Sequence, residues 1–201
     1  AVTHEHIDHI AGIGVMMRRY HIPVWANAAT WAAMESQVGK IDKSLVNIFD
    51  NDSSFEIGEI GVKPFSIPHD AADPVGYSFM CGDEKVAVAT DIGELKKDLF
   101  EAIRGSKTVL LESNHDVNML EIGKYPPQLK CRIRGKLGHL SNDDAGRAAE
   151  FLVRLGTERI ILGHLSEENN YPELARLIRN ARETNDSMPD FVLSRAADIM
   201  A

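Results

Sequence analysis

The chain has 201 residues, of which 44% are hydrophobic and 26% charged, a composition typical of a soluble globular domain rather than of collagen or low-complexity disorder. No apolar run approaches the roughly 18 residues that a membrane helix needs, and no basic and then apolar leader opens the sequence, so we expect a cytoplasmic protein without a membrane span. The formal net charge of −8 repels nucleic-acid backbones at long range, unless basic residues cluster or bound cations reverse the local sign.

The first half of the chain is predicted to hold helices followed by a β-meander. The spacing of apolar residues and the alanine content predict helices at 10–20 and 28–37 and strands at 24–25, 62–67, 75–81 and 85–89. Gly82 and Asp83 form the turn of a hairpin between the last two strands. The final strand runs directly into Asp91, and an acid at a strand end is a common place for chemistry.

The second half alternates between helices and strands, which predicts a layered α/β fold. The predicted helices are 95–103, 143–155 and 172–184, and the predicted strands are 108–111, 159–162 and 191–193. Ser141 can cap the middle helix, with Asp144 reaching back to it, and Gly156 ends that helix. We find no internal repeat or linker and therefore expect one domain over residues 1–201.

The two cysteines carry no metal or redox signature. Cys81 and Cys131 lie far apart in sequence and lack the short spacings of zinc knuckles and redox pairs. We expect both to be buried thiols in a reducing compartment, which agrees with a cytoplasmic location.

Candidate metal ligands concentrate in THEHIDHIAG, residues 3 to 12. His4, His6, Asp8 and His9 supply the imidazole and carboxylate donors of this segment. A loop would let them converge, whereas a strand would send His9 to the face opposite the others. Further donors follow apolar strands at His69, Asp91 and His164. Such a set suits zinc, manganese or iron, and it offers enough donors for two ions.

The motif HxHxDH at residues 4 to 9, followed by single His69, Asp91 and His164, resembles the metallo-β-lactamase fold of binuclear hydrolases. The resemblance implies an α/β fold with an αββα sandwich. It also implies one metal on His4, His6 and His69, a second on Asp8, His9 and His164, and Asp91 bridging both. Segments at 69–79, 89–93, 111–120, 125–143 and 162–170 look more closely like the WalJ/YycJ branch of that family, bacterial exonucleases that degrade double-stranded DNA.

The resemblance has one departure at the N-terminus. Family members begin with further strands before the histidine motif, whereas here residues 1–3 stand in that place. The resemblance therefore implies a sandwich that lacks its first strands, with unpaired backbone groups at an edge and exposed apolar faces. We expect the chain to self-associate or aggregate unless a partner supplies strands; a monodisperse monomer that melts cooperatively would contradict this.

The expected reaction is phosphodiester hydrolysis by a hydroxide that bridges two divalent ions. The resemblance implies that the substrate is double-stranded DNA and that degradation proceeds as a 5′–3′ exonuclease. Asp91 would fix the spacing of the ions, and Asp8 counts among both the ligands and the catalytic groups. His139 lies outside the ligand set and is the candidate general acid, with Glu112 tuning it; alternatively, His139 simply precedes a helix cap. Hydrogen-bond partners for the histidine ligands are sought among Glu5, Asp70 and Asp116.

A basic stretch leads to His139 and is the candidate DNA contact. It comprises Lys124, Lys130, Arg132, Arg134 and Lys136, and no acid occurs from 122 to 142. Lysine and arginine near two metals would contact phosphates without reading bases, although a solvated charged loop is the alternative. His115, at a strand exit, is a further candidate for substrate contact or a hydrogen-bonded loop residue.

Two other functions stay open at this point. A hydrolase of another ester class, such as a lactone or a thioester, would use the same metals without needing the basic stretch or an acid at His139. A metal-binding but inactive scaffold, or a partner-binding module, would agree with an incomplete first sheet.

Overall fold

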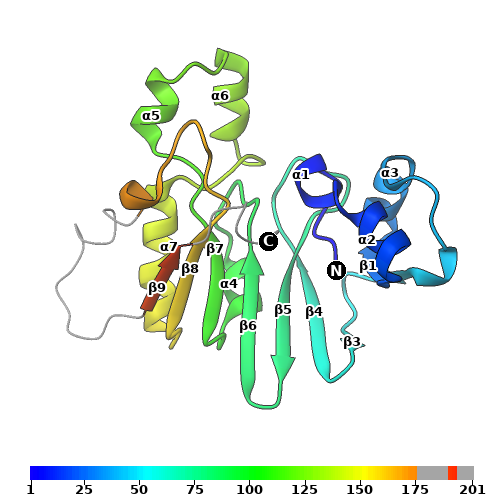
Figure 1. Ribbon diagram of the computed structural model, residues 1–201. Helices are drawn as coiled ribbons and strands as arrows, with labels where there is room; N and C mark the ends of the chain where they lie inside the picture. Colours follow the sequence, from blue (N-terminus) through cyan, green and yellow to red (C-terminus); the bar gives the residue numbers. More distant parts are fainter. Residues whose placement is uncertain (176–189, 194–201) are drawn as a thin grey trace.

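The computed structural model describes residues 1–175 and 190–193, which form two β-sheets with surrounding helices (Figure 1). The helices are α1 (Ile7–Ile10), α2 (Ile13–Tyr20), α3 (Ala28–Val38), the 3-10 turn η1 (Lys43–Leu45), α4 (Lys97–Ile103), α5 (Val117–Ile122), α6 (Pro127–Ile133) and α7 (Asn142–Arg154). The strands are β1 (Val24–Asn27), β2 (Val46–Phe49), β3 (Phe55–Ile57), β4 (Ile60–Ser66), β5 (Val75–Cys81), β6 (Glu84–Ala89), β7 (Thr108–Glu112), β8 (Arg159–Gly163) and β9 (Asp190–Leu193).

The larger sheet has seven strands in the order β3-β4-β5-β6-β7-β8-β9. Strands β3 to β6 pair antiparallel, which is the predicted meander, and β6 to β9 pair parallel. Parallel strands end at the same edge of a sheet. The residues that follow β6, β7 and β8 are therefore brought together at one edge.

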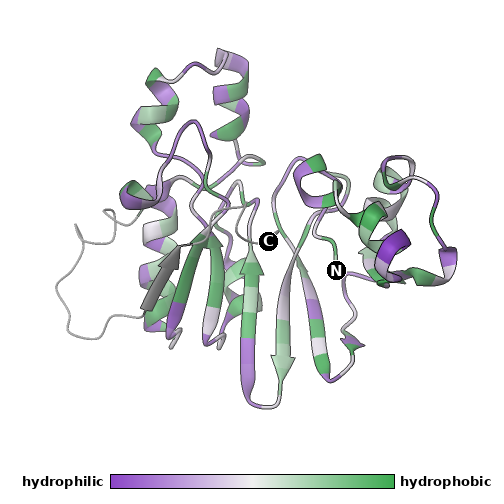
Figure 2. Cartoon of the chain, viewed as in Figure 1, coloured by the Kyte–Doolittle hydropathy of each residue, from purple (hydrophilic) through white to green (hydrophobic). Residues whose placement is uncertain are grey.

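Helices α4 and α7 cover one face of this sheet (Figure 1) and enclose the largest hydrophobic cluster. The Ser141 hydroxyl accepts the Asp144 N–H at 3.1 Å, so the predicted cap of α7 is confirmed. Behind it, Ala148 and Leu152 pack against Leu111 and Ile160 of the parallel strands, which are largely hydrophobic in Figure 2. Burying a side chain such as leucine contributes about 1.5–3 kcal/mol, and this cluster fixes the strands that carry the edge residues.

The smaller sheet pairs β1 and β2 in parallel and packs with α2 and α3 around Met17 and Met34. The first residues of the chain connect the two sheets. The Val2 N–H donates to the Trp25 carbonyl at 2.8 Å, and the Val75 N–H donates to the Thr3 carbonyl at 3.0 Å. The histidine motif consequently begins at the junction of the sheets.

Two helical predictions need correction. The predicted helix 10–20 is divided into α1 and α2, with Ala11 and Gly12 between them. The histidine motif is not wholly a loop, because Asp8 and His9 lie in the single turn α1, where an acid in the first turn is favourable. The helix α6 was not predicted; Pro127 starts it, as proline does readily at a first helical position.

The cysteine prediction is wrong: Cys81 and Cys131 are unpaired and both are exposed. Cys81 ends β5 at a hairpin turn, and Cys131 is on α6, so neither reaches a hydrophobic cluster. The predicted strand 191–193 corresponds to β9, whereas most of the predicted helix 172–184 lies outside the described residues. Among the described helices, none has the length and apolar character needed to cross a bilayer.

Candidate metal centre

Donor side chains from separate segments converge at the edge where the parallel strands end. His69 follows β4, Asp91 follows β6, Glu112 ends β7, His139 precedes α7 and His164 follows β8. The segment His4 to His9 reaches the same edge, because residues 1–3 are hydrogen-bonded between the sheets. The structure therefore brings together every predicted ligand, in overlapping groups whose donor atoms lie within 4.8 Å of one another.

The first group is His4, His6 and His69. The His6 Nδ1 and His69 Nε2 atoms lie 3.2 Å apart. Two nitrogens that each bind one tetrahedral zinc at about 2.0–2.1 Å are separated by about 3.3 Å. The spacing of these imidazoles thus fits two ligands of a single ion.

The hydrogen bonds of this group leave the Nε2 atoms of His4 and His69 free to bind a metal ion. The Gly138 carbonyl can only accept, so the His69 Nδ1–H donates to it at 3.1 Å and the lone pair is on Nε2. The His4 Nδ1 atom lies 3.1 Å from the Thr3 hydroxyl, while His4 Nε2 is buried and has no partner among the described residues. Burial lowers the pKa of His4 to about 3. His4 is therefore neutral at neutral pH, as a metal ligand must be.

The second group is Asp8, His9 and His164. The Asp8 Oδ2 atom lies 3.6 Å from both His9 Nε2 and His164 Nε2. The Thr3 hydroxyl is 3.1 Å from His9 Nδ1, so Thr3 contacts one histidine of each group. The contact with His164 is the main cause that holds the pKa of Asp8 below its usual range.

Asp91 lies between the two groups and is only 1% exposed. Its Oδ2 atom is 3.4 Å from His9 Nε2, and its Oδ1 atom is 3.4 Å from His164 Nε2 and 3.8 Å from His69 Nε2. Burial opposes ionisation, but the contacts with His9 and His164 outweigh it and keep the pKa of this carboxyl well below its usual range. Asp91 Oδ2 has no hydrogen-bond partner among the described residues. Burying an ionised carboxylate whose oxygen lacks a hydrogen bond costs several kcal/mol, and a cation beside it would offset that cost.

Glu112 connects the second group to His139. Its Oε1 atom accepts from Nδ1 of His139 and from Nδ1 of His164, both at 2.8 Å. Its Oε2 atom accepts the N–H groups of Ile92 at 2.8 Å and Leu140 at 3.0 Å. Despite complete burial, these contacts lower the pKa of Glu112 to about 2. One carboxylate thus orients both a candidate ligand and the candidate acid.

His139 lines the cleft beside the metal groups and keeps its Nδ1 on Glu112. Burial disfavours its protonated form, but the hydrogen bond and charge of Glu112 outweigh burial and raise the pKa of His139. Gly138 is required next to it, because a Cβ there would lie 2.1 Å from the Ile133 carbonyl. Glu112 therefore favours the protonated form of the His139 imidazole, which lines the cleft.

The backbone at two candidate ligands is strained. Asp91 and His164 have left-handed φ angles of 60° and 55°, which cost energy for residues other than glycine. The Asn114 side chain donates to the His164 carbonyl at 3.0 Å and holds that turn. Sequence reasoning missed Asn114 and Thr3; for Thr3, its position directly before the first histidine was an available signal.

The three carboxylates expected as hydrogen-bond partners of the histidines, those of Asp70, Glu5 and Asp116, make different contacts. Asp70 Oδ1 is 3.6 Å from His69 Nε2, and the other oxygen of Asp70 accepts from Arg132. Glu5 accepts the Ala72 N–H at 2.8 Å and fixes the loop after His69. Asp116 does not serve a histidine, because its carboxylate caps α5 by accepting the Met119 N–H at 2.8 Å.

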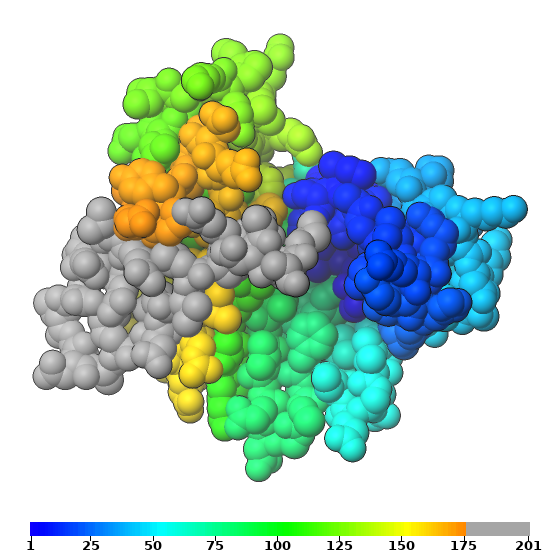
Figure 3. Space-filling model, in the orientation of Figure 1, coloured from blue at the N-terminus to red at the C-terminus, as the bar shows by residue number. Residues whose placement is uncertain are grey.

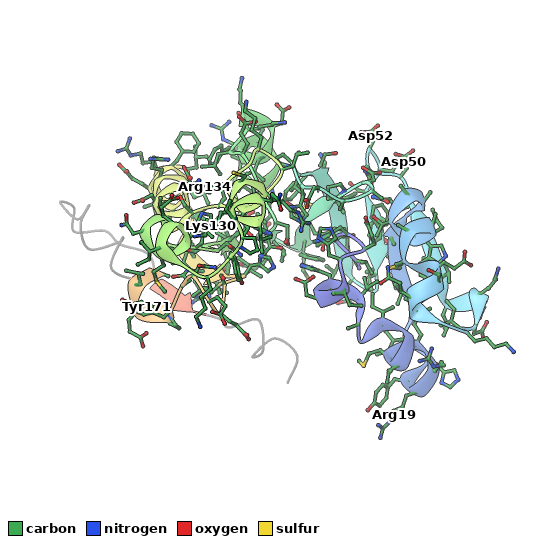
Figure 4. The ribbon with its side chains drawn as sticks, turned by 90° about the horizontal axis from the view of Figure 1, so that it is seen from above. Arg19, Asp50, Asp52, Lys130, Arg134 and Tyr171 are labelled. Carbon is green, nitrogen blue, oxygen red and sulfur yellow. The ribbon has the colours of Figure 1, made fainter. Side chains whose placement is uncertain are left out.

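Of the basic residues predicted to contact DNA, Arg132 lines the cleft, whereas Lys130 and Arg134 bond to Glu121. A cleft of about 1260 Å³ includes Arg132 in its lining together with His139 and part of the candidate donor set, namely His6, Asp8, His9, Asp91 and His164. Lys130 donates to the Glu121 carbonyl at 2.6 Å and Arg134 pairs with the Glu121 carboxylate at 2.7 Å, so both side chains lie on the side of α6 toward α5 (Figure 4). His115 is 2% exposed and is absent from the cleft lining, so its predicted substrate contact is not supported.

Comparisons with known proteins show the family to which the chain belongs. A family model described as a beta-lactamase superfamily domain matches residues 1–165. The chain is 43% identical over 176 residues to exodeoxyribonuclease YycJ of Bacillus anthracis, covering 88% of this chain and 67% of that protein.

Two solved structures show the fold. The metallo-beta-lactamase fold protein YhfI of Bacillus subtilis has a TM-score of 0.65 and 16% identity, with 96% of this chain and 73% of that chain covered. Zinc-bound PqqB of Methylobacterium extorquens has a TM-score of 0.67 and 16% identity, with coverages of 96% and 69%. The described residues therefore have the metallo-β-lactamase fold that the sequence predicted.

Proposed function

This chain belongs to the beta-lactamase superfamily and is a metal-dependent hydrolase; we propose that it acts as an exonuclease on double-stranded DNA and degrades it in the 5′–3′ direction. The observation that carries the proposal is the position of Asp91 between two groups of donors, in a cleft that also contains His139 and Arg132. The relative from Bacillus anthracis, an exodeoxyribonuclease, supports DNA as the substrate.

We propose that His4, His6 and His69 hold one divalent ion, that Asp8, His9 and His164 hold a second, and that Asp91 contacts both. The buried, unpartnered atoms His4 Nε2 and Asp91 Oδ2 support this assignment, because a cation would satisfy both of them. The nitrogen and carboxylate donors suit zinc, manganese or iron. Such ions would neutralise the charge of a phosphodiester and make a water molecule more acidic at neutral pH.

His139 is the proposed general acid for the departing alkoxide. Glu112 fixes the ring through Nδ1, so the other nitrogen, Nε2, is available to hold the proton that the leaving oxygen needs. The hydrogen bond and charge of Glu112 outweigh burial and raise the pKa of His139, which favours the protonated form that a general acid needs. Glu112 acts through His139 and is therefore a positioning residue.

The proposed phosphate contacts are Lys130, Arg132 and Arg134. Arg132 and Arg134 now pair with the carboxylates of Asp70 and Glu121, while Lys130 donates to the Glu121 backbone carbonyl; the three side chains come from α6 and its C-cap. A phosphate that enters the cleft would replace Asp70 as the partner of Arg132. Exposed ion pairs are worth little, so this exchange is inexpensive.

The decisive experiment is degradation of duplexes labelled at the 5′ or the 3′ end, with metal analysis of the same preparation and Asp91→Ala as the control. Stepwise release from the 5′ end that depends on divalent metal and is absent in Asp91→Ala is the expected result. Stoichiometric metal without hydrolysis of any ester would favour the scaffold. Hydrolysis of a lactone or thioester, with DNA left intact, would favour the other ester class.

We also propose that the chain self-associates and that it is located in the cytoplasm. Around the smaller sheet, α2 exposes Val15, Met16 and Tyr20, and β2 exposes Ile48, so this part of the molecule presents apolar side chains to solvent. We expect light scattering to report species larger than a monomer. A monodisperse monomer would remove this part of the proposal and leave the nuclease activity untouched.

A further inference from the structure

We propose that Tyr125, Leu129 and Ile133 form a subsite in the cleft that binds the unpaired base of the terminal nucleotide. The inference rests on the proposed nuclease function and extends it, since it names where the base lies while its phosphate is at the metal groups. All three side chains line the same cleft as Asp91 and His139.

The helix α6 has two chemically different sides. Leu129 and Ile133 are four residues apart and share one face, and both line the cleft. Lys130 and Arg134 are also four residues apart, and both bond to Glu121, so they lie together on the side of α6 toward α5 (Figure 4). An apolar face that is directed into a polar, metal-binding cleft needs an explanation.

Packing against the protein interior accounts for only part of this face. Ile133 is buried, at 9% exposed, and offers the cleft little surface, whereas Leu129 is half-buried and belongs to no hydrophobic cluster of the described residues. The Tyr125 ring is half-buried, and its hydroxyl has no hydrogen bond within the described part of the chain. Tyr125 precedes Pro126, which restricts its backbone to extended conformations and limits where the ring can go.

A second element contributes an apolar side chain to the same cleft. Ile7 lies between the ligand candidates His6 and Asp8, is 63% exposed and lines the cleft from α1. The molecular surface is indented between the α5–α6 side and the N-terminal residues (Figure 3). The cleft thus offers aromatic and aliphatic side chains from two directions beside the proposed reaction centre.

A nucleobase is the ligand that fits these side chains. An enzyme that cuts at a duplex end must separate the terminal nucleotide from its neighbours before the phosphate can enter a cleft, and unstacking costs a few kcal/mol. Stacking of the base on an aromatic ring offsets part of the unstacking free energy. It does not depend on the base sequence, because each base has a π-face. The basic residues of α6 provide the matching contacts for the phosphates.

The test pairs a protein variant with a substrate variant. Tyr125→Ala, Tyr125→Phe and wild type are each assayed for kcat/KM on a duplex with an intact terminal nucleotide and on one with an abasic terminal nucleotide. The abasic residue is placed at the end from which wild type degrades the duplex. Tyr171→Ala, which removes an exposed aromatic ring outside the cleft lining, is the matched control.

We expect Tyr125→Ala to lose about tenfold or more on the intact duplex, as stacking energies imply, and Tyr125→Phe to retain activity. Wild type should lose a similar factor on the abasic duplex, and Tyr125→Ala should lose nothing further there. Equal losses of Tyr125→Ala on both substrates would overturn the subsite while the nuclease function stands. A wild type that cleaves no DNA would instead overturn the proposed function itself.

Discussion

The candidate metal centre and the α5–α6 projection face the same cleft but are organised differently. At the candidate centre, His4, His69, Asp91 and Glu112 are buried, and Asp91 and His164 have left-handed conformations. On the projection, Lys130 and Arg134 form exposed contacts with Glu121, and α5 and α6 extend above the sheet (Figure 1). The donor side chains at the edge of the sheet are held in one arrangement, whereas Lys130 and Arg134 on the projection can exchange Glu121 for a phosphate.

This difference separates chemistry from substrate binding. Buried, hydrogen-bonded donors cost energy in the folded protein and are retained where an ion must be held in fixed geometry. Exposed cations cost little and can follow a flexible DNA backbone. Variants of the centre should therefore alter metal binding and turnover, and variants of the projection should alter affinity and its salt dependence.

The largest effect is expected from Asp91→Ala. Removing the carboxylate that contacts both donor groups leaves His9, His69 and His164 without their shared anion, so metal binding and nuclease activity should both fall to background. Metal analysis after dialysis and the end-labelled assay measure the two effects. A variant that keeps both ions would show that Asp91 is not a shared ligand.

His139→Ala should lose activity without losing metal. General acid catalysis contributes about 10²–10⁴-fold, so turnover should fall within that range while the metal content matches wild type. His21→Ala, which removes an exposed imidazole outside the cleft lining, is the control and should remain active. If His139→Ala loses metal together with activity, His139 is a ligand rather than the acid.

The pH profile follows from the direction of the His139 pKa. A general acid works only while protonated. Burial lowers the pKa of His139, but Glu112 outweighs burial and raises it, so the decline of kcat/KM with rising pH should occur above the ordinary pKa of a histidine. The residual activity of His139→Ala should lack that decline. A decline that persists unchanged in the variant would assign it to another group.

The convergence of the candidate donors could be predicted from the sequence because these donors follow recognisable strands. His69, Asp91 and His164 stand after apolar runs whose packing is dictated by their own composition, and the parallel order of β6, β7 and β8 brings the residues after β6 and β8 to one edge. The dense histidine motif supplies the other candidate donors. The pairing of His139 with Glu112 was also predicted, although not that the same Glu112 oxygen would accept from His164.

The projection was poorly predicted for a physical reason. Helices α5 and α6 have six and seven residues, and over so few residues an apolar pair four residues apart does not distinguish a helix from a loop. The pairing of Arg132 with Asp70 joins residues far apart in sequence, and only the folded chain defines it. The burial of His115 likewise follows from its bridge to Ser141, which sequence spacing does not reveal.

A smaller effect is expected from the basic residues of the projection. Replacing Lys130 and Arg134 by alanine should weaken DNA binding and flatten the plot of log affinity against log salt concentration by about 0.9 for each phosphate that the variant no longer neutralises. Arg19→Ala removes a cation at the other end of the molecule (Figure 4) and is the matched control. An unchanged slope in the double variant would mean that DNA does not bind to this side of α6.

The smallest effects concern stability and compare two helix caps. Ser141 caps α7, which packs in the largest hydrophobic cluster, and Asp116 caps α5, none of whose residues belongs to a cluster within the described part of the chain. Ser141→Ala should lower the free energy of unfolding by about 1 kcal/mol. Asp116→Ala should lower it less, because α5 can open locally while the sheet and α7 remain folded. Urea denaturation of both variants measures the difference, and equal losses would show that the projection unfolds cooperatively with the core.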